Sequence, residues 1–223
     1  CSGRFEAALT SGKETKRDAL ARLANEIVGE KTRIYVFALG DEGEGARGVT
    51  SLSRAGGSAP GLTEAMLPKG DDGEPKEHIL TLDFADIPEL ARRYPGAGAL
   101  ALFVENPTLG DALDDCTLVP IARADLEANP ARGTGERALG VYPVDVPAAV
   151  FDRELTPELR ALRGLIFNHV GHALGGPFWI QEADEYGVID EFLFEVSERI
   201  GDLNLGDSGE LYLFSGSSMM QCY

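Results

Sequence analysis

The fold is decided by Leu80-Thr81-Leu82-Asp83-Phe84, which is followed after a short connection by Gly98-Ala99-Leu100-Ala101-Leu102-Phe103. In both stretches leucine alternates with a smaller or polar residue, which is the pattern of a strand with one buried face. The last third of the chain repeats the arrangement in Phe192-Leu193-Phe194-Glu195-Val196 and Gly209-Glu210-Leu211-Tyr212-Leu213-Phe214. The sequence therefore predicts the same two-strand unit twice.

A glycine pair precedes each copy of this unit, Gly56-Gly57 in the first and Gly175-Gly176 in the second. Two copies are too few for a solenoid, which needs three or more repeats to bury a continuous core. A duplicated unit that closes on itself is the simpler solution, and the alternating pattern favours antiparallel pairing. We expect an α+β fold with mainly antiparallel sheets from two related β-rich halves.

The flanking segments add an N-terminal helix and short peripheral helices. Apolar spacing over 5–29 predicts the first helix, and the β-branched and aromatic run 33–39 predicts a strand after it. Short helices are expected at 85–93 and from Thr156-Pro157, where a hydroxyl cap precedes proline at the first helical position. Further strands are predicted at 117–121 and 138–142, whereas glycine and proline in 53–75 indicate a long connection with little regular structure.

The chain is interpreted as a single domain, because 223 residues with 43% hydrophobic content suffice for one large core. Four parts are expected within 1–223. They are an N-terminal helix and strand (1–49), a first half-repeat (50–110), a connecting region (111–168) and a second half-repeat (169–223).

Acidic residues strongly outnumber basic ones, 37 against 20, for a formal net charge of −17. Such a field repels phosphate backbones, so we expect no nucleic-acid partner. It attracts a basic protein and accelerates the encounter with it. A role in solubility alone is the simpler alternative. The sequence leaves the oligomeric state open.

Three scattered cysteines, Cys1, Cys116 and Cys222, lack the spacing of a disulfide framework or a zinc site. No apolar run of about 18 residues predicts a transmembrane segment. We therefore expect a cytoplasmic protein. The alternative is a lipid-anchored protein, since Cys1-Ser2-Gly3 resembles the start of a processed bacterial lipoprotein, although a trimmed chain would begin in the same way.

Four motifs resemble the YwqG-like family, a bacterial domain family of unknown function. They are Gly56-Gly57-x-x-Pro60, the segment from Leu82-Asp83-Phe84 to Phe103, the run Leu174 to Gln181, and the run Leu205 to Phe214. The resemblance covers roughly residues 50 to 215 and implies an α+β fold with two similar halves and no established enzymatic activity. Leu67-Pro68 stands where the family often has Trp-Pro, and Thr81 and Glu195 stand where it often has glutamine, so a binding feature built on those glutamines would be altered here.

Catalytic, metal and cofactor signatures are not found in the sequence. His169 and His172 have a spacing that could share a metal on a helix, but the glycines around them favour a loop or a helix end. Cys116 lacks a neighbouring base, and such cysteines are usually inert core residues. No glycine-rich phosphate loop is present, and Gly206-Asp207-Ser208-Gly209 fits a tight turn better than a nucleophile elbow. We expect no catalytic residues, no metal site and no cofactor.

The one tryptophan, Trp179, is the most informative candidate for a binding surface, together with Gln181 and Glu182. An exposed tryptophan can anchor an interface, although a position between Phe178 and Ile180 is more typical of a core.

Two functional hypotheses follow. The first is a non-enzymatic protein-binding domain, in the form of an immunity or antitoxin-type protein for a basic partner. The alternative is a small-molecule-binding protein or an enzyme with an unrecognised site between the two halves, where a pocket lined by His169, His172, Trp179 and the acidic residues around Asp184 would favour it.

Overall fold

The computed structural model describes residues 15–40, 52–105, 107, 116–129, 136–180, 190–201, 203–205 and 209–221. In chain order its elements are α2 (Lys16–Glu26), β1 (Lys31–Leu39), β2 (Arg54–Ala55), η2 (Glu64–Met66), β3 (Glu77–Asp83), α3 (Pro88–Arg93), β4 (Ala97–Val104), β5 (Cys116–Ala122), α4 (Arg123–Ala128), β6 (Arg137–Pro147), η4 (Ala148–Phe151), α5 (Pro157–Phe167), β7 (Gly171–Ala173), β8 (Phe192–Ser197), η6 (Glu198–Ile200), β9 (Glu210–Phe214) and β10 (Ser218–Gln221).

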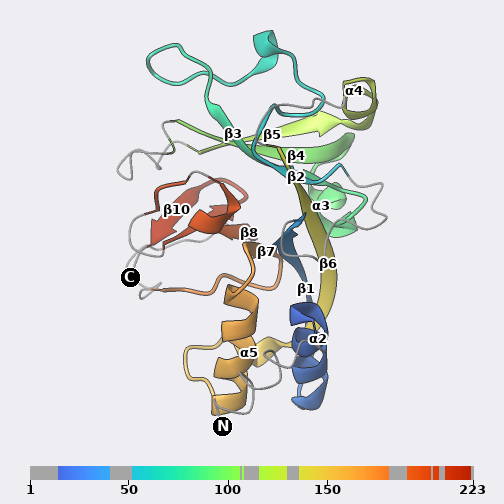
Figure 1. The fold of residues 1–223 in the computed structure, drawn as a ribbon, viewed down its shortest axis with the longest axis vertical. Coiled ribbons are helices and arrows are strands. Elements are labelled where there is room, and N and C mark those ends of the chain that lie inside the picture. Colours follow the sequence, from blue (N-terminus) through green and yellow to red (C-terminus); the bar gives the residue numbers. More distant parts are fainter. Residues whose placement is uncertain are drawn as a thin grey trace.

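The strands described form one ten-stranded sheet in the order β10-β9-β8-β7-β1-β6-β2-β3-β4-β5, and every neighbouring pair is antiparallel. The expected α+β class with mainly antiparallel strands is therefore confirmed. The long central pair β1 and β6 runs in continuous register from Lys31 opposite Pro147 to Leu39 opposite Leu139. Figure 1 shows these two strands as a bent spine from which the other strands extend at one end.

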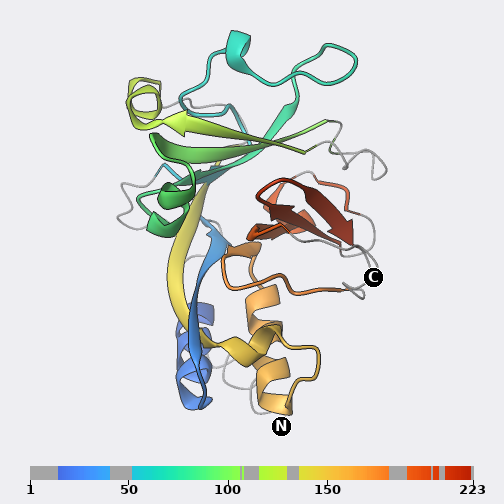
Figure 2. The ribbon, with the colours of Figure 1, turned by 180° about the vertical axis from the view of Figure 1, so that it is seen from behind.

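The sheet curls back on itself. Strands β2 to β5, which we call the first wing, face strands β7 to β10, the second wing, across one core. The inner cluster contains Leu80 and Leu82 of β3 together with Leu211 and Leu213 of β9, which lie far apart in the strand order. Alternation in these strands directs the leucines inward, as the sequence pattern predicts. Figure 2 shows β9 and β10 opposite β3, β4 and β5 from the reverse side.

Two smaller clusters cover the outside of the sheet. Helices α2 and α5 pack on the far end of β1 and β6, where Leu20, Leu162 and Val36 are fully buried. The other cluster covers the outer face of β4 and contains Phe103, Ile121 and Leu126. Each face of the sheet is thus buried over part of its area, which explains why β4 is apolar at nearly every position.

Several boundaries differ from the sequence expectation. The described part of the first helix is α2, which ends at Glu26 rather than at Gly29. It begins after Thr15, whose hydroxyl accepts a hydrogen bond from the Asp18 amide. Strand β6 continues beyond the predicted 138–142 through Pro143 to Pro147. Strands β2, β7 and β10 and helix α4 were not predicted. These elements are only two to six residues long, too short to show a period.

Candidate functional site

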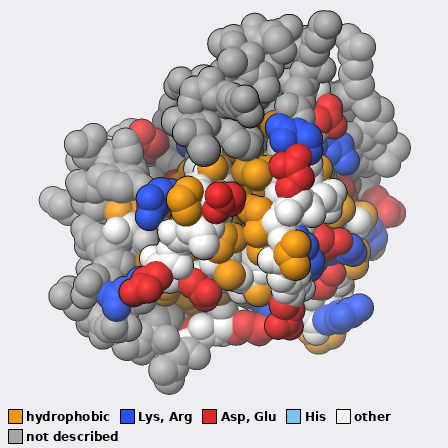
Figure 3. All heavy atoms as spheres, turned by 90° about the horizontal axis from the view of Figure 1, so that it is seen from below, with side chains coloured by type: hydrophobic (Ala, Val, Ile, Leu, Met, Phe, Trp, Pro, Cys, Tyr) orange, Lys and Arg blue, Asp and Glu red, His pale blue; other side chains and the backbone are white. Residues whose placement is uncertain are grey.

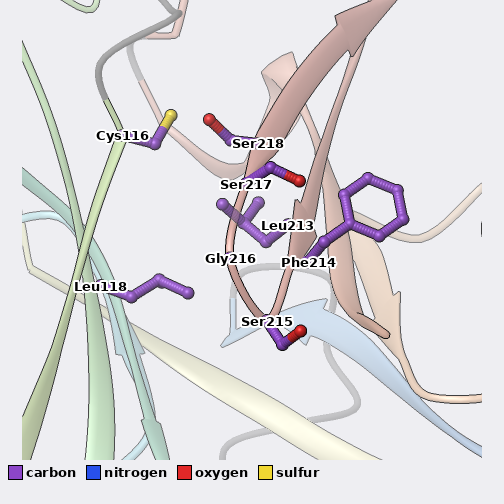
Figure 4. Close-up of a pocket in the computed structure, with 8 residues that line it drawn as sticks. All are labelled: Cys116, Leu118, Leu213, Phe214, Ser215, Gly216, Ser217 and Ser218. Atoms are coloured by element: carbon purple, nitrogen blue, oxygen red, sulfur yellow. The ribbon is translucent and has the colours of Figure 1, made fainter. Parts of the chain in front are cut away.

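A cavity of about 310 Å³ lies where the two ends of the curled sheet approach each other. It is lined by Cys116 and Leu118 of β5 and by the run Leu213 to Ser218, which forms the β9–β10 hairpin. We call this gap between β5 and the hairpin the seam. Figure 4 shows Cys116 and Leu118 on one side of the seam, facing Leu213, Ser217 and Ser218 on the other, while the Phe214 ring points away.

The seam lies between the outermost strand β5 and the turn that joins β9 to β10, the outermost strand at the other end of the sheet, of which Ser218 lines the cavity. Within the described part of the chain, β5 pairs only with β4 and β10 only with β9. An outermost strand carries backbone N–H and C=O groups directed away from its neighbour, and these can pair with a further strand. Cys116 and Leu118 of β5 and Met220 of β10 are only partly buried and pack against the inner core. Apolar side chains of the core are therefore partly open at the seam.

The hairpin on one side of the seam is fixed by hydrogen bonds to the start of β8. The Phe214 amide donates to the carbonyl of Ser217 at 2.8 Å and closes the turn. The Ser215 amide donates to the carbonyl of Glu191 at 2.9 Å, and the Ser217 hydroxyl donates to Asp190 Oδ2 at 2.9 Å. The exposed carboxylate of Asp190 consequently lies against the residues that line the cavity.

Strand β5 is anchored on the other side through Thr117, whose hydroxyl lies 3.0 Å from the ammonium of the buried Lys76. Cys116 begins this strand as a half-buried cysteine. The expectation of a core cysteine is met in part, because Cys116 packs against the inner core but is only half-buried at the outermost strand β5.

Trp179 does not line the cavity and lies on the outer face of β9, next to Phe214 of the seam. Its ring is half-buried and packs on Tyr212 at a centroid distance of 5.2 Å and on Phe214 at 6.0 Å. Side chains of the sheet hold the backbone beside it, since Tyr212 donates to the carbonyl of Phe178 and Gln221 accepts from the amide of Ile180. Gln181 and Glu182 lie outside the described residues, so their predicted binding role stays a prediction.

The two histidines of the predicted pair face different partners. His169 Nδ1 lies 2.9 Å from the carbonyl of Leu165, and its Nε2 contacts the Tyr142 hydroxyl. His172 is fully buried on β7, with Nε2 2.9 Å from the carbonyl of Gly176 and Nδ1 3.1 Å from Glu195 Oε1. They line no shared pocket in the described part of the chain. The acidic residues around Asp184 lie outside that part, as does the predicted turn at 206–208.

A second buried carboxyl lies beside Glu195. Glu210 on β9 pairs in register with Ser197, two residues beyond Glu195 on β8, so the three side chains share one face. Burial, followed by the charge of Glu195, raises the pKa of Glu210 to about 9. Glu210 is therefore protonated at neutral pH, and the alternating strand pattern gave no sign of this.

On the opposite side of the sheet, the buried carboxylate of Asp83 is paired with a partly exposed arginine, Arg123. Asp83 accepts hydrogen bonds from the guanidinium of Arg123, from the amide of Ala85 and from the amide of Leu52. Burial alone would raise the pKa of Asp83, but the hydrogen bonds from Arg123 and the two amides outweigh it and lower the pKa. This pair joins β3 to α4 and stabilises the fold rather than forming a reactive site.

Comparison with known proteins gives no family: no family model matches the sequence, and no curated protein sequence matches it. None of the helices in the described residues is long and apolar enough to cross a membrane. The same residues contain no group of three metal-ligating side chains in suitable positions. The inner core occupies most of the space enclosed by the curled sheet, and the seam at its edge is the candidate site considered below.

Proposed function

We propose that the protein is a non-enzymatic protein-binding domain that takes up an extended segment of a partner as an added strand at the seam. The observation that carries this proposal is a cavity between β5 and the β9–β10 hairpin, next to the two outermost strands, β5 and β10, which have no further strand partner among the described residues. Strand addition is a common mode of peptide recognition, in which backbone hydrogen bonds give affinity and side-chain pockets give specificity.

The overall charge supports a basic partner. A net charge of −17 attracts a cationic segment and speeds its encounter with the seam. On the face seen in Figure 3, the described acidic and basic side chains are interspersed, so that face offers no concentrated acidic patch. An immunity or antitoxin-type protein that neutralises a basic partner would need such a combination of an acidic chain and a binding site like the seam.

We also propose that the chain consists of two related halves and belongs to the YwqG-like family. The strand order supports duplication, because β2 to β5 extend from one side of the central pair and β7 to β10 from the other. Two consecutive residues with positive φ also end both short strands, Gly56-Gly57 after β2 and Leu174-Gly175 after β7. In this interpretation β1 and β6 are the first strands of the two copies, and each pairs with the second strand of the other copy.

The direct test is NMR titration of the labelled protein with an extended heptapeptide in which valine alternates with lysine. We expect chemical-shift changes confined to the amides of β5 and β10 and weaker binding at higher salt. Changes spread over other surfaces, or none at either outermost strand, would refute strand addition.

A pair of variants in β5 provides the matched control. Leu118 packs towards the inner core at the seam, whereas Val119 packs towards the outer cluster, and both are half-buried. Leu118→Lys is expected to abolish binding of the cationic peptide by placing a positive charge in the cavity. Val119→Lys changes the opposite face and should leave binding within about twofold. Equal effects would show that general destabilisation of β5 is responsible.

A further inference from the structure

We infer that the cavity in the seam is a specificity pocket for one basic side chain, lysine or arginine, of the partner segment. This inference rests on the proposed function, because it assigns a side chain to the strand that the seam accepts. It adds a requirement at one position, which strand addition by itself does not impose.

The walls of the cavity match the aliphatic part of such a side chain. Leu118 and Leu213 face each other across it, and Cys116 lies beside Leu118 (Figure 4). Lysine and arginine bury their methylene stems along apolar surface while the charged head stays in a polar or solvated place. A side chain that is polar along its whole length would leave these leucine surfaces without a partner.

The rim of the cavity matches the cationic head. Three serines, Ser215, Ser217 and Ser218, supply hydroxyl oxygens that can accept a hydrogen bond from an ammonium or a guanidinium. The Asp190 carboxylate is bound by the Ser217 hydroxyl at 2.9 Å and forms no ion pair with the described residues. The neighbouring Glu191 differs, because its carboxylate is paired with Arg93 at 2.6 Å. Asp190 does not itself line the cavity, but its exposed carboxylate lies one hydrogen bond away through Ser217, where it can meet a cationic head.

The size of the cavity limits what it can take. About 310 Å³ lies at the lower end of the range of roughly 300–1,000 Å³ that is usual for ligand sites. A single long side chain suits this volume better than a complete small-molecule ligand. The described lining residues of the cavity include no lysine or arginine.

The experiment compares heptapeptides that differ only at the central position, which carries lysine, arginine, norleucine or glutamate. Norleucine keeps the stem of lysine and removes its charge. With the natural chain we expect the lysine and arginine peptides to bind roughly three- to tenfold more tightly than the norleucine peptide, and the glutamate peptide to bind most weakly.

Asp190→Asn provides the matched variant, since asparagine can still accept the Ser217 hydroxyl. It should remove the preference for lysine over norleucine while leaving the affinity for the norleucine peptide unchanged. A lysine preference that survives Asp190→Asn, or equal binding of lysine and norleucine peptides to the natural chain, would overturn the pocket but leave strand addition standing. Failure of all four peptides to perturb β5 and β10 would overturn the proposed function itself.

Discussion

Replacing Glu210 by glutamine should stabilise the protein at neutral and alkaline pH and have little effect at acidic pH. Glu210 is almost fully buried on β9, beside the second carboxyl of Glu195. Burial and that neighbouring charge raise the pKa of Glu210 to about 9, from an ordinary value of 4.5. Glutamine keeps the size and the neutrality of the protonated acid, so it removes the cost of keeping a proton on this group.

The size of the effect follows from proton linkage. Below about pH 4.5 both the folded and the unfolded chain carry the proton, and the two proteins should be equally sensitive to pH. Between about pH 4.5 and 9 only the folded state keeps it, so the stability of the natural chain falls by about 1.4 kcal/mol for each pH unit relative to the variant. At pH 7.5 the difference reaches about 4 kcal/mol, because about three units separate that pH from the ordinary pKa.

Urea denaturation followed by circular dichroism at several values between about pH 5 and pH 9 measures this difference directly. Glu154→Gln, a substitution of an exposed carboxylate, serves as the control for general charge effects, which matter in a chain of net charge −17. A constant offset between Glu210→Gln and the natural chain across the whole range would refute the assignment of a buried, protonated Glu210.

Three further predictions test the fold. Arg123→Ala leaves the buried Asp83 carboxylate without its cation and should cost about 2–3 kcal/mol of unfolding free energy in urea, and an unchanged midpoint would contradict the role of the pair. Gly171→Ala should prevent folding or cost more than about 3 kcal/mol, because φ is 152° and the new Cβ would lie 2.2 Å from a carbonyl oxygen of β8. The control Gly73→Ala, where φ is 83° and the added Cβ meets no atom, should cost only about 1 kcal/mol. Similar losses of stability for the two variants in thermal unfolding would refute this contrast. Tyr35→Phe removes the hydrogen bond to the α3 carboxylate at 2.6 Å and should cost about 1 kcal/mol. Because burial and that bond raise the pKa of Tyr35 to about 12, alkaline absorbance titration of the variant should lack one ionisation near that pH.

The principal strands could be predicted from the sequence because each carries its own period. Strands β3, β4 and β9 alternate leucine with other residues, β8 is an apolar run with one carboxylate, and the predicted places of all four agree with the structure within three residues. Helix α5 was predicted from Thr156-Pro157 for a similarly local reason, since the hydroxyl of Thr156 accepts from the Leu159 amide. The α+β class and the antiparallel pairing followed from these local patterns.

The candidate site could not be predicted in this way. Cys116, Leu118 and Ser217 belong to segments far apart in the chain, and neither histidine spacing nor a tryptophan motif pointed to them. The strongest sequence signal, Trp179, marks instead a half-buried ring on the outer face of β9. Serines and leucines are too common to indicate a cavity until the ends of the sheet are brought together.

By itself, then, the sequence determined the longer strands, which of their faces are buried, and the strongly acidic character of the chain. Only the tertiary structure decided that β5 and β10 are the outermost strands and that a cavity lies between β5 and the β9–β10 hairpin. The same holds for the burial of Glu210 beside Glu195. The physical reason is that strand alternation and helix capping act over a few neighbouring residues, whereas the curl of a sheet depends on the twist and packing of all its strands together.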